Sequence, residues 1–491
     1  MKRIVKKWWL LILIVSISIF LRAWQIREGF TYNHDNDLAG WIIKDIVVNK
    51  HLRLVGQLTS TQGIFIGPLF YYYELIFYLI TKMDPIGGVF AVLFLGAFST
   101  FSFWFVFTRV FGKNEGYLAA LIHTFSYYLI LNDREVVPTM PVILWTVWFF
   151  YTVNLLLKGK KEGLILFGFL VGLIWHLNLA LILTAPVALL AIILSKKSLA
   201  KEGIIKGLII LVFTSLPLLL FELRHNFNQV RALILAFTTP QQDIIYGFAK
   251  FQRVLLLLGK NVKTFLFGPG LPVSYSLALT SSIIVFLYLY LKRKIAKNIF
   301  ITLTFWGVSY VAFFSLYSKT LSEYYLNGVL FVWIIILVVL ISSLISSKYK
   351  TIGFAFLGVY AAVNLYSFFT HQYSRNGYIE RKQIVEAIDA DRIARGYPCV
   401  SISYIVNPGY DLGYRYLFWL RNMHVNRPDS GAPPYTIVFP LKDIFVTDKT
   451  FGAIGLIYPD YSRYTKDSIA KSCSGQNSNL TDPMFGYTDQ K

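Results

Sequence analysis

Long apolar stretches alternate with short polar connections along most of the chain. The stretches long enough to form spans are 8–21, 86–108, 115–131, 139–157, 164–176, 179–195, 204–222, 272–291, 298–317, 326–346 and 351–370. A helix needs about 20 apolar residues to cross a bilayer. The region 164–195 is too long for one span, and its break at His176-Leu177-Asn178 predicts two helices joined by a tight turn. The pattern therefore predicts an α-helical polytopic membrane protein of about 11 spans.

One further stretch, 64–81, is apolar but carries Gly67-Pro68, three successive tyrosines and Glu74. Cytoplasmic loops are enriched in Lys and Arg, and this bias sets the orientation. The basic loops all fall on one side of the membrane only if 64–81 does not cross it. These loops are the N-terminus, 109–113, 158–161, 196–206, 292–297 and 348–350. We therefore predict a multi-pass plasma-membrane protein in which 64–81 is a helix in the outer interface, the N-terminus is cytoplasmic and the C-terminal part is extracytoplasmic.

The outer side is predicted to carry two long loops and a separate domain. The loops span 25–85 and 223–271, and the first contains a second interfacial helix at 38–50. From residue 372 the charge becomes ordinary and turn signals appear, which predicts a membrane domain at 1–371 and a small α/β domain at 372–491. The elements expected in the α/β domain are helix 378–395, strand 398–405, helix 409–423 and strand 435–440.

The chain has two cysteines, Cys399 and Cys473, both in this outer domain. Two are too few for a disulfide scaffold. A bridge between them is open in an oxidising compartment, but Cys399 also begins an apolar strand and can be a plain core residue. Both interpretations stay open at the level of the sequence.

The amino-acid composition agrees with a membrane protein and excludes several other classes of protein. The sequence is 56% apolar and 15% charged, against about 25% charged residues in soluble domains, and its mean hydropathy is +0.55. These values exclude a disordered chain, a coiled coil and a nucleic-acid-binding tail. The net charge of +21 resides mainly in the cytoplasmic loops, so it is a topology signal and no nucleic-acid partner is expected. The sequence has no Walker-type loop, no Rossmann glycine pattern and no zinc motif.

Acids are scarce outside the C-terminal domain, so each one in an outer loop is informative. Asp35 and Asp37 stand directly before the helix predicted at 38–50. Their carboxylates can activate a hydroxyl nucleophile or hold a divalent cation. The simpler interpretation of Asp37 is an N-cap for a helix that starts at Leu38. Asp35 stands too early for that cap, so it is a candidate for chemistry.

Two more polar clusters lie in outer connections. Asp133, Arg134 and Glu135 form either a local ion pair that orients the helix ends or a site in which Arg134 holds a phosphate or a carboxylate. The second cluster, at the end of the 204–222 span, comprises Glu222, Arg224 and His225. Its Arg and His suit a lipid phosphate, and the alternative for the Arg is snorkelling at the interface.

His176 lies at the outer turn between two spans. A single His at a helix end is more often a hydrogen-bonded structural residue than a ligand or a base. His176 therefore ranks below the other candidates.

Four stretches, taken in order, resemble a known group. They are the acidic outer loop with Asp35, the interfacial stretch Gly67–Tyr73, Arg134 with Pro138, and the stretch Phe221–Phe227. The pattern is similar to the GT-C membrane glycosyltransferases. More narrowly, it resembles the bacterial group of the protein O-mannosyltransferase and aminoarabinose transferase family, which is glycosyltransferase family 39-like. The resemblance covers roughly residues 1–370.

The resemblance implies transfer of a sugar, with inversion, from a polyprenyl-phosphate donor to a lipid, glycan or protein acceptor on the outer face. It makes Asp35 the base or the group that orients the acceptor. Many relatives carry an acid or an amide five residues after the arginine, where this chain has Thr139. Either Glu135 or Asp133 takes its place, or the second acid is dispensable. The candidate catalytic residues are Asp35, Asp37 and Glu135, the donor-phosphate candidates are Arg134, Arg224 and His225, and further candidates are His176, Glu222 and Tyr72.

Other interpretations stay open. A divalent metal ion held by Asp35 and Asp37 is compatible with the sequence but is not implied by it. A glycan polymerase or ligase would use polyprenyl-diphosphate donors. A lipid or sugar transporter would carry charged residues within its spans, and the spans here hold almost none. We hypothesise that the C-terminal domain binds the acceptor or covers the outer site.

Overall fold

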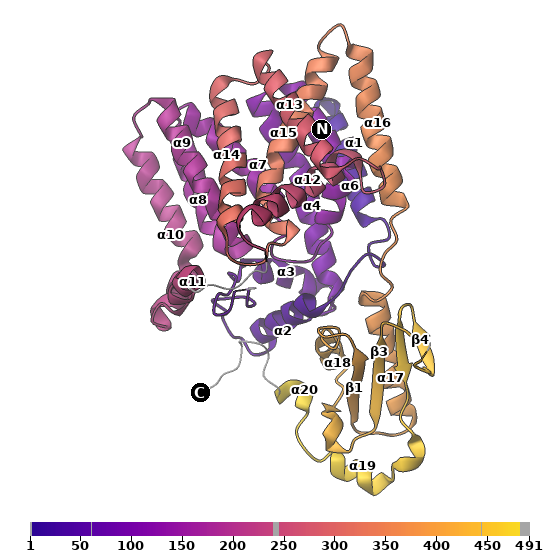
Figure 1. The fold of residues 1–491 in the computed structure, drawn as a ribbon. Coiled ribbons are helices and arrows are strands. Elements are labelled where there is room, and N and C mark those ends of the chain that lie inside the picture. The colour runs from indigo at the N-terminus through magenta and orange to yellow at the C-terminus, as the bar shows by residue number, and fades with distance from the viewer. Residues whose placement is uncertain (1, 60, 239–244, 443, 482–491) are drawn as a thin grey trace.

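The computed structural model describes residues 2–59, 61–238, 245–442 and 444–481. Figure 1 shows a bundle of helices with a small sheet-containing region beyond one end, which we call the sheet-side end of the bundle. Each predicted span is helical over most of its length. The elements concerned are α1 (Lys2–Ala23), α4 (Ile86–Val110), α5 (Lys113–Phe125), α6 (Tyr127–Asn132), α7 (Val142–Leu157), α8 (Lys161–Leu177), η1 (Leu179–Thr184), α9 (Ala185–Ser195), α10 (Lys201–Arg224), α13 (Tyr275–Leu291), α14 (Lys297–Leu316), η2 (Glu323–Leu326), α15 (Asn327–Ile345) and α16 (Lys350–Phe369).

Several of these helices suit a bilayer by length and composition. Within the described residues, the stretches long and apolar enough to cross are Ile86–Val110, Lys201–Arg224, Lys297–Leu316, Glu323–Ile345 and Lys350–Phe369, and shorter apolar helices accompany them. Helix α15 is buried on nearly all sides, whereas α10 leaves Ile209 and Phe213 exposed at 61% and 74%. An apolar surface of that kind needs lipid to cover it. The predicted polytopic helical fold is confirmed.

The basic connections gather at the end of the bundle that lies away from the sheet. Figure 1 places the N-terminus and the α9–α10 and α15–α16 connections there. Lys161 pairs with Glu202 at 2.8 Å, and Lys197 donates to the carbonyl of Lys158, so neighbouring basic loops touch. The grouping that the positive-inside rule required is therefore present in the fold.

Two helices lie across the sheet-side end, as predicted. They are α2 (His34–Val48) and α3 (Leu69–Ile80). Helix α2 begins four residues before the predicted start, because the side chain of Asn33 accepts a hydrogen bond from the backbone N–H of Asp35 and caps the helix there. Helix α3 buries Phe70, Tyr71, Glu74 and Tyr78 and exposes the rest of its apolar surface.

The region 223–271 is wrongly predicted as a loop. It contains α11 (Asn228–Thr238) and α12 (Gly247–Phe267). Helix α12 buries an apolar face with Val254, Leu258, Val262 and Phe265 and packs against α13 and α14. Three lysines and one arginine interrupt the apolar residues of this helix in the sequence, which hides its helical period from a hydropathy analysis.

The C-terminal region is a small α/β unit around a five-stranded sheet of order β2-β1-β3-β5-β4. Strand β1 runs parallel to β2 and β3, and β5 runs antiparallel to β3 and β4. Its elements are α17 (Tyr378–Ala394), β1 (Val400–Val406), α18 (Arg415–Leu420), β2 (Val425–Asn426), η3 (Pro428–Ser430), β3 (Pro434–Phe439), β4 (Lys449–Phe451), β5 (Ile454–Ile457), η4 (Tyr461–Arg463), α19 (Lys466–Ser472) and α20 (Ser478–Thr481). The helix predicted at 409–423 is much shorter, because Gly409 and Gly413 both have positive φ and hold the preceding segment as a loop.

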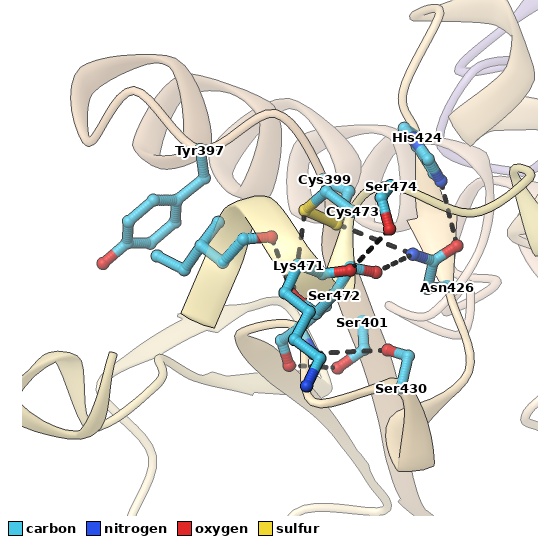
Figure 2. Close-up of a disulfide and its surroundings, with 12 residues drawn as sticks. Tyr397, Cys399, Ser401, His424, Asn426, Ser430, Lys471, Ser472, Cys473 and Ser474 are labelled. Atoms are coloured by element: carbon cyan, nitrogen blue, oxygen red, sulfur yellow. Dashed lines mark hydrogen bonds between the residues drawn. A yellow bond between two sulfur atoms is a disulfide. The ribbon is translucent and has the colours of Figure 1, made fainter. Parts of the chain in front are cut away.

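A disulfide between Cys399 and Cys473 settles the alternative that the sequence left open. It joins the residue before β1 to the residue after α19, and Figure 2 shows Asn426 beside it. The Asn426 amide donates to the carbonyl of Ser472 at 3.1 Å and to Cys399 Sγ at 3.6 Å. The bridge therefore ties the last helices of the chain to the sheet.

The C-terminal region is packed firmly on the sheet-side end of the bundle. The backbone N–H of Tyr378 donates to the carbonyl of Phe30 at 3.0 Å, and the Tyr416 hydroxyl donates to the carbonyl of Met83 at 2.7 Å. Lys382 pairs with Asp84 at 2.7 Å. Apolar residues from both parts form one buried cluster. The two parts thus share a core.

Candidate active site

Asp35 is the partly exposed acid of the first outer segment. It stands in the first turn of α2, where the aligned peptide dipoles favour a negative charge. Gln57 donates from Nε2 to its Oδ1 at 3.4 Å. Burial raises the pKa of Asp35, and the neighbouring His34 partly opposes this rise. A carboxylate that is reachable and partly desolvated suits proton removal from a hydroxyl.

Cations reach the same area from α12 and η2. Tyr324, in η2, lies within electrostatic reach of Asp35. The preceding residue, Glu323, pairs with Lys260 Nζ of α12 at 2.6 Å, and Asn261 donates to the Glu323 carbonyl at 3.2 Å. These contacts fasten α12 to η2.

A second lysine stands on the loop before η2. Lys319 Nζ donates to Thr61 Oγ1 at 3.4 Å, and the Lys319 carbonyl accepts from Lys250 Nζ at 2.6 Å. Thr61 belongs to the loop 51–66, which also carries Gln57. We call Asp35, Tyr324, Lys260 and Lys319 the acid–lysine cluster. The sequence prediction missed its last three members, and the helical period of 247–267 is the signal that would have found Lys260.

Glu135 lies at the same end of the bundle. Glu135 and Glu323 are both within electrostatic reach of Tyr128. The side chain of Glu135 is exposed, yet the surrounding protein raises its pKa by desolvation. Exposure and a raised pKa are compatible when the side chain lies in a concave part of the surface, where water reaches it but protein surrounds it. The assignment of Glu135 as a catalytic residue stays a prediction.

Asp37 has a structural setting. The N-cap interpretation is wrong, because Asn33 caps α2. Asp37 is 4% exposed, and its Oδ1 accepts hydrogen bonds from the Tyr32 hydroxyl at 3.1 Å and from the backbone N–H of Tyr416 at 3.0 Å. Burial raises its pKa to about 6. Asp37 thereby joins α2 to α18.

We expect Asp37→Asn to keep both transfer activity and fold, because the amide oxygen can accept the same two hydrogen bonds. The raised pKa means that the folded state binds the proton more tightly, so this group lowers stability as pH rises through about 6. Asp37→Asn should remove that loss, whereas Asp37→Leu leaves the Tyr416 N–H unpaired and should cost about 1–3 kcal/mol. Thermal unfolding at pH 5 and pH 8 measures both. A stable Asp37→Asn variant without activity would instead make Asp37 catalytic.

Asp133 and Arg134 do not pair with each other, so the local ion-pair interpretation is wrong. Asp133 Oδ2 binds Arg22 Nε of α1 at 2.8 Å and His123 Nε2 of α5 at 3.1 Å, all of them buried. Arg134 donates to the Gln25 carbonyl at 2.9 Å and to the Tyr373 hydroxyl at 2.6 Å. Through these two hydrogen bonds Arg134 joins the segment after α1 to the segment after α16. Its assignment to a donor phosphate stays a prediction.

Glu222, Arg224 and His225 lie at the sheet-side end of α10. Arg224 and His225 are exposed, and the His225 ring stacks on Phe221. Glu222 is buried and accepts from the backbone N–H of Val230 at 3.3 Å, which ties α10 to α11. Phe65 contacts Phe221, so the loop that touches Asp35 also reaches this cluster. Glu222 therefore fastens α10 to α11, whereas the side chains of Arg224 and His225 are exposed.

His176 and Tyr72 hold the same loop and helix in place. His176 Nε2 is 2.9 Å from the Thr214 carbonyl, and its Nδ1 accepts from the N–H of Leu69 at 3.4 Å. A Cβ on Gly67 would overlap the His176 ring, so only glycine allows this approach. The Tyr72 hydroxyl donates to the Arg53 carbonyl at 3.0 Å. His176 therefore holds the start of α3 against α10, and Tyr72 holds the loop at Arg53 against α3.

The pair Asp35 and Asp37 does not form a metal site. Residues two apart on an α-helix point to nearly opposite faces, and Asp37 is directed toward Tyr416. Within the described residues no group of three His, Cys, Asp or Glu side chains could hold a metal ion. The metal site suggested for these two residues is therefore wrong in its geometry.

Comparison with known proteins defines the fold. No family model and no curated protein matches this sequence. Among solved structures, the chain is similar to ArnT from Cupriavidus metallidurans bound to undecaprenyl phosphate, with a TM-score of 0.61 at 10% identity over 95% of this chain and 99% of that one. The apo form of the same ArnT gives 0.61 at 10% identity over 93% and 98%. This chain has a GT-C fold.

The GT-C match extends over the whole architecture, because nearly all of both chains superimpose. It therefore includes the helical bundle and the C-terminal region. An oligosaccharyltransferase of Archaeoglobus fulgidus, solved with zinc and sulfate, is also similar, at a TM-score of 0.47 and 12% identity over 87% of this chain and 67% of that one. The two ArnT structures confirm the GT-C resemblance of the sequence at the level of fold.

Proposed function

We propose that this protein is a membrane glycosyltransferase that moves a sugar from a polyprenyl-phosphate donor to an acceptor hydroxyl at the sheet-side face, with inversion. The observation that carries the proposal is Asp35, a partly exposed acid whose pKa burial raises, in an ArnT-like fold. Lys260 pairs with Glu323, next to Tyr324, and Lys319 contacts Thr61, in the same loop as Gln57. That the ArnT structure holds undecaprenyl phosphate supports the same class of donor here.

In this proposal Asp35 removes the proton from the acceptor hydroxyl. The acceptor oxygen forms a bond to the anomeric carbon from the face opposite the phosphate, and the bond from that carbon to the phosphate oxygen breaks. The leaving polyprenyl phosphate takes the electron pair, so it needs cations more than a general acid. The lysines of the acid–lysine cluster supply that charge, and Arg224 and His225 face the membrane interface from which the lipid arrives.

The sheet-side face is, by the same proposal, extracytoplasmic. Two features support this orientation. The basic connections lie at the opposite end of the bundle, where the positive-inside rule expects the cytoplasm. The disulfide between Cys399 and Cys473 belongs to an oxidising compartment.

We propose that the C-terminal domain helps to select the acceptor. Asp411, in the loop between β1 and α18, acts electrostatically on His34, which directly precedes Asp35. In the same loop Gly413 packs against Asn33, and Tyr410 is 40% exposed. An acceptor that approaches Asp35 from this side would meet the loop. This supports the hypothesis that the domain binds the acceptor or covers the site.

The direct test uses the purified full chain with defined donors. Polyprenyl-monophosphate sugars should give lipid phosphate and a glycosylated acceptor. Turnover restricted to diphosphate-linked donors would favour a polymerase or ligase. Movement of the lipid across liposomes without covalent transfer would overturn the proposal in favour of a transporter.

Removing a phosphate-binding lysine should weaken donor binding. We expect Lys319→Met and Lys260→Met each to raise the KM for the donor by about 10-fold or more, since hydrogen bonds to charged groups are worth about 1.5–3 kcal/mol. Lys292→Met is the matched control, because Lys292 is exposed at the far end of α13. Steady-state kinetics at varied donor concentration measure the effect. Unchanged KM in both cluster variants would place the phosphate elsewhere.

A further inference from the structure

A cavity of about 400 Å³ lies where the C-terminal domain meets the bundle. Its polar walls are Arg27 after α1, Thr81 and Asp84 between α3 and α4, and Tyr378, Lys382 and Gln383 on α17. The cavity is separate from the acid–lysine cluster. None of the residues that line it belongs to that cluster.

The acids of this cavity are already neutralised by protein groups. Asp84 accepts hydrogen bonds from the Tyr378 hydroxyl and from Lys382 Nζ. Glu386, which also lines the cavity, pairs with Arg421. Arg27 is exposed, and its side chain has no ion pair or hydrogen bond with any residue that the structure describes. The cavity therefore retains one cationic side chain that an anion could bind.

Lipid-facing surfaces lead to this cavity. On α3, Ile76 and Ile80 are exposed at 55% and 73%, and on α4, Phe90 and Phe94 are exposed at 48% and 62%. Each pair is spaced by four residues and so lies on one helix face. The α3–α4 turn, which forms one wall of the cavity, joins these two helices. A molecule seated here would have apolar surface beside it and polar groups around its head.

We propose that the cavity binds the phosphate-bearing headgroup of a membrane phospholipid, with the acyl chains along α3 and α4. Arg27 supplies the charge for the phosphate, and Gln383 and Thr81 add polar groups near it. Because one wall belongs to the bundle and another to α17, a bound headgroup would hold the C-terminal domain against the bundle. A ligand that binds only this docked state stabilises it.

The test uses the full chain in detergent, with phosphatidylglycerol, diacylglycerol or glycerol phosphate added. We expect phosphatidylglycerol alone to raise the unfolding temperature and to remain bound in native mass spectrometry. Arg27→Gln should weaken phosphatidylglycerol binding by about 10-fold, and Arg27→Lys should restore part of it. Arg463→Gln, at an exposed site of the same domain, is the matched control.

Two results would overturn the proposal. One is equal phosphatidylglycerol binding by Arg27→Gln, Arg463→Gln and the unaltered protein. The other is equal stabilisation by glycerol phosphate, which would identify a site for free anions. If Arg27→Gln fails to fold, Gln383→Leu provides the same comparison from the exposed face of α17.

Discussion

Replacing Asp35 by Asn should lower the rate of sugar transfer by about 10²–10⁴-fold, the range that a positioned general base contributes. The amide cannot take the acceptor proton, although it can still pair with Gln57. Donor binding and unfolding temperature should be unchanged, because Asp35 is partly exposed and makes a single long hydrogen bond. Single-turnover transfer with a polyprenyl-phosphate sugar measures the loss. Asp37→Asn, two residues away, is the matched control.

The pH dependence of transfer activity is a second test of Asp35 as the base. The base must be ionised to act, so activity should fall as pH falls through the pKa of Asp35. Because burial raises this pKa, the acidic limb should lie above the usual range of an aspartate. Full activity of Asp35→Asn with an unaltered pH profile would show that another group is the base, and Glu135 would then be the next candidate.

Breaking the buried pair between Arg22 and Asp133 should destabilise the protein by about 3–5 kcal/mol, because one charge is left uncompensated in the interior. Arg22 is fully buried and also donates to Ser18 Oγ at 2.7 Å and to the His123 carbonyl at 3.1 Å. The variant Asp133→Asn removes the charge that balances it. The unfolding midpoint in detergent measures the change.

The double variant Arg22→Met/Asp133→Leu removes both charges together and should recover much of the stability that Asp133→Asn loses. The exposed pair of Lys161 and Glu202 is the control, since Lys161→Met should cost no more than about 1 kcal/mol. If Asp133→Asn is as stable as the unaltered protein, this pair does not hold the segment that carries Arg134 and Glu135.

The sequence predicted the parts of this protein that depend on local patterns. Apolar runs defined the span helices, because the length of an apolar run needed to cross a bilayer is fixed by the bilayer. The distribution of Lys and Arg grouped the connections on one side and kept 64–81 out of the membrane. In the C-terminal region, helix 378–395 and strands 398–405 and 435–440 fall on α17, β1 and β3. Asp35 was identified because an acid beside a membrane surface is rare enough to be conspicuous.

The sequence could not predict which side chains meet. Asp133 stands next to Arg134 in the chain but pairs with Arg22, which is 111 residues away. Hydropathy did not predict helix α12, because the helix contains lysines. Their partners, such as Glu323 and the Lys319 carbonyl, come from distant segments and are known only from the fold. Asp37 accepts a hydrogen bond from Tyr416, which is 379 residues away in the sequence.

By itself, then, the sequence determined a polytopic helical membrane protein and the grouping of its loops, because periodicity and charge bias act over a few turns of chain. The role of Asp35 as a base stays a prediction. Only the tertiary structure decided that Gln57 contacts Asp35, that Asp37 supports the C-terminal domain, and that Cys399 is bridged to Cys473. These depend on contacts between distant segments, and their energies exist only once the bundle and the sheet have packed together.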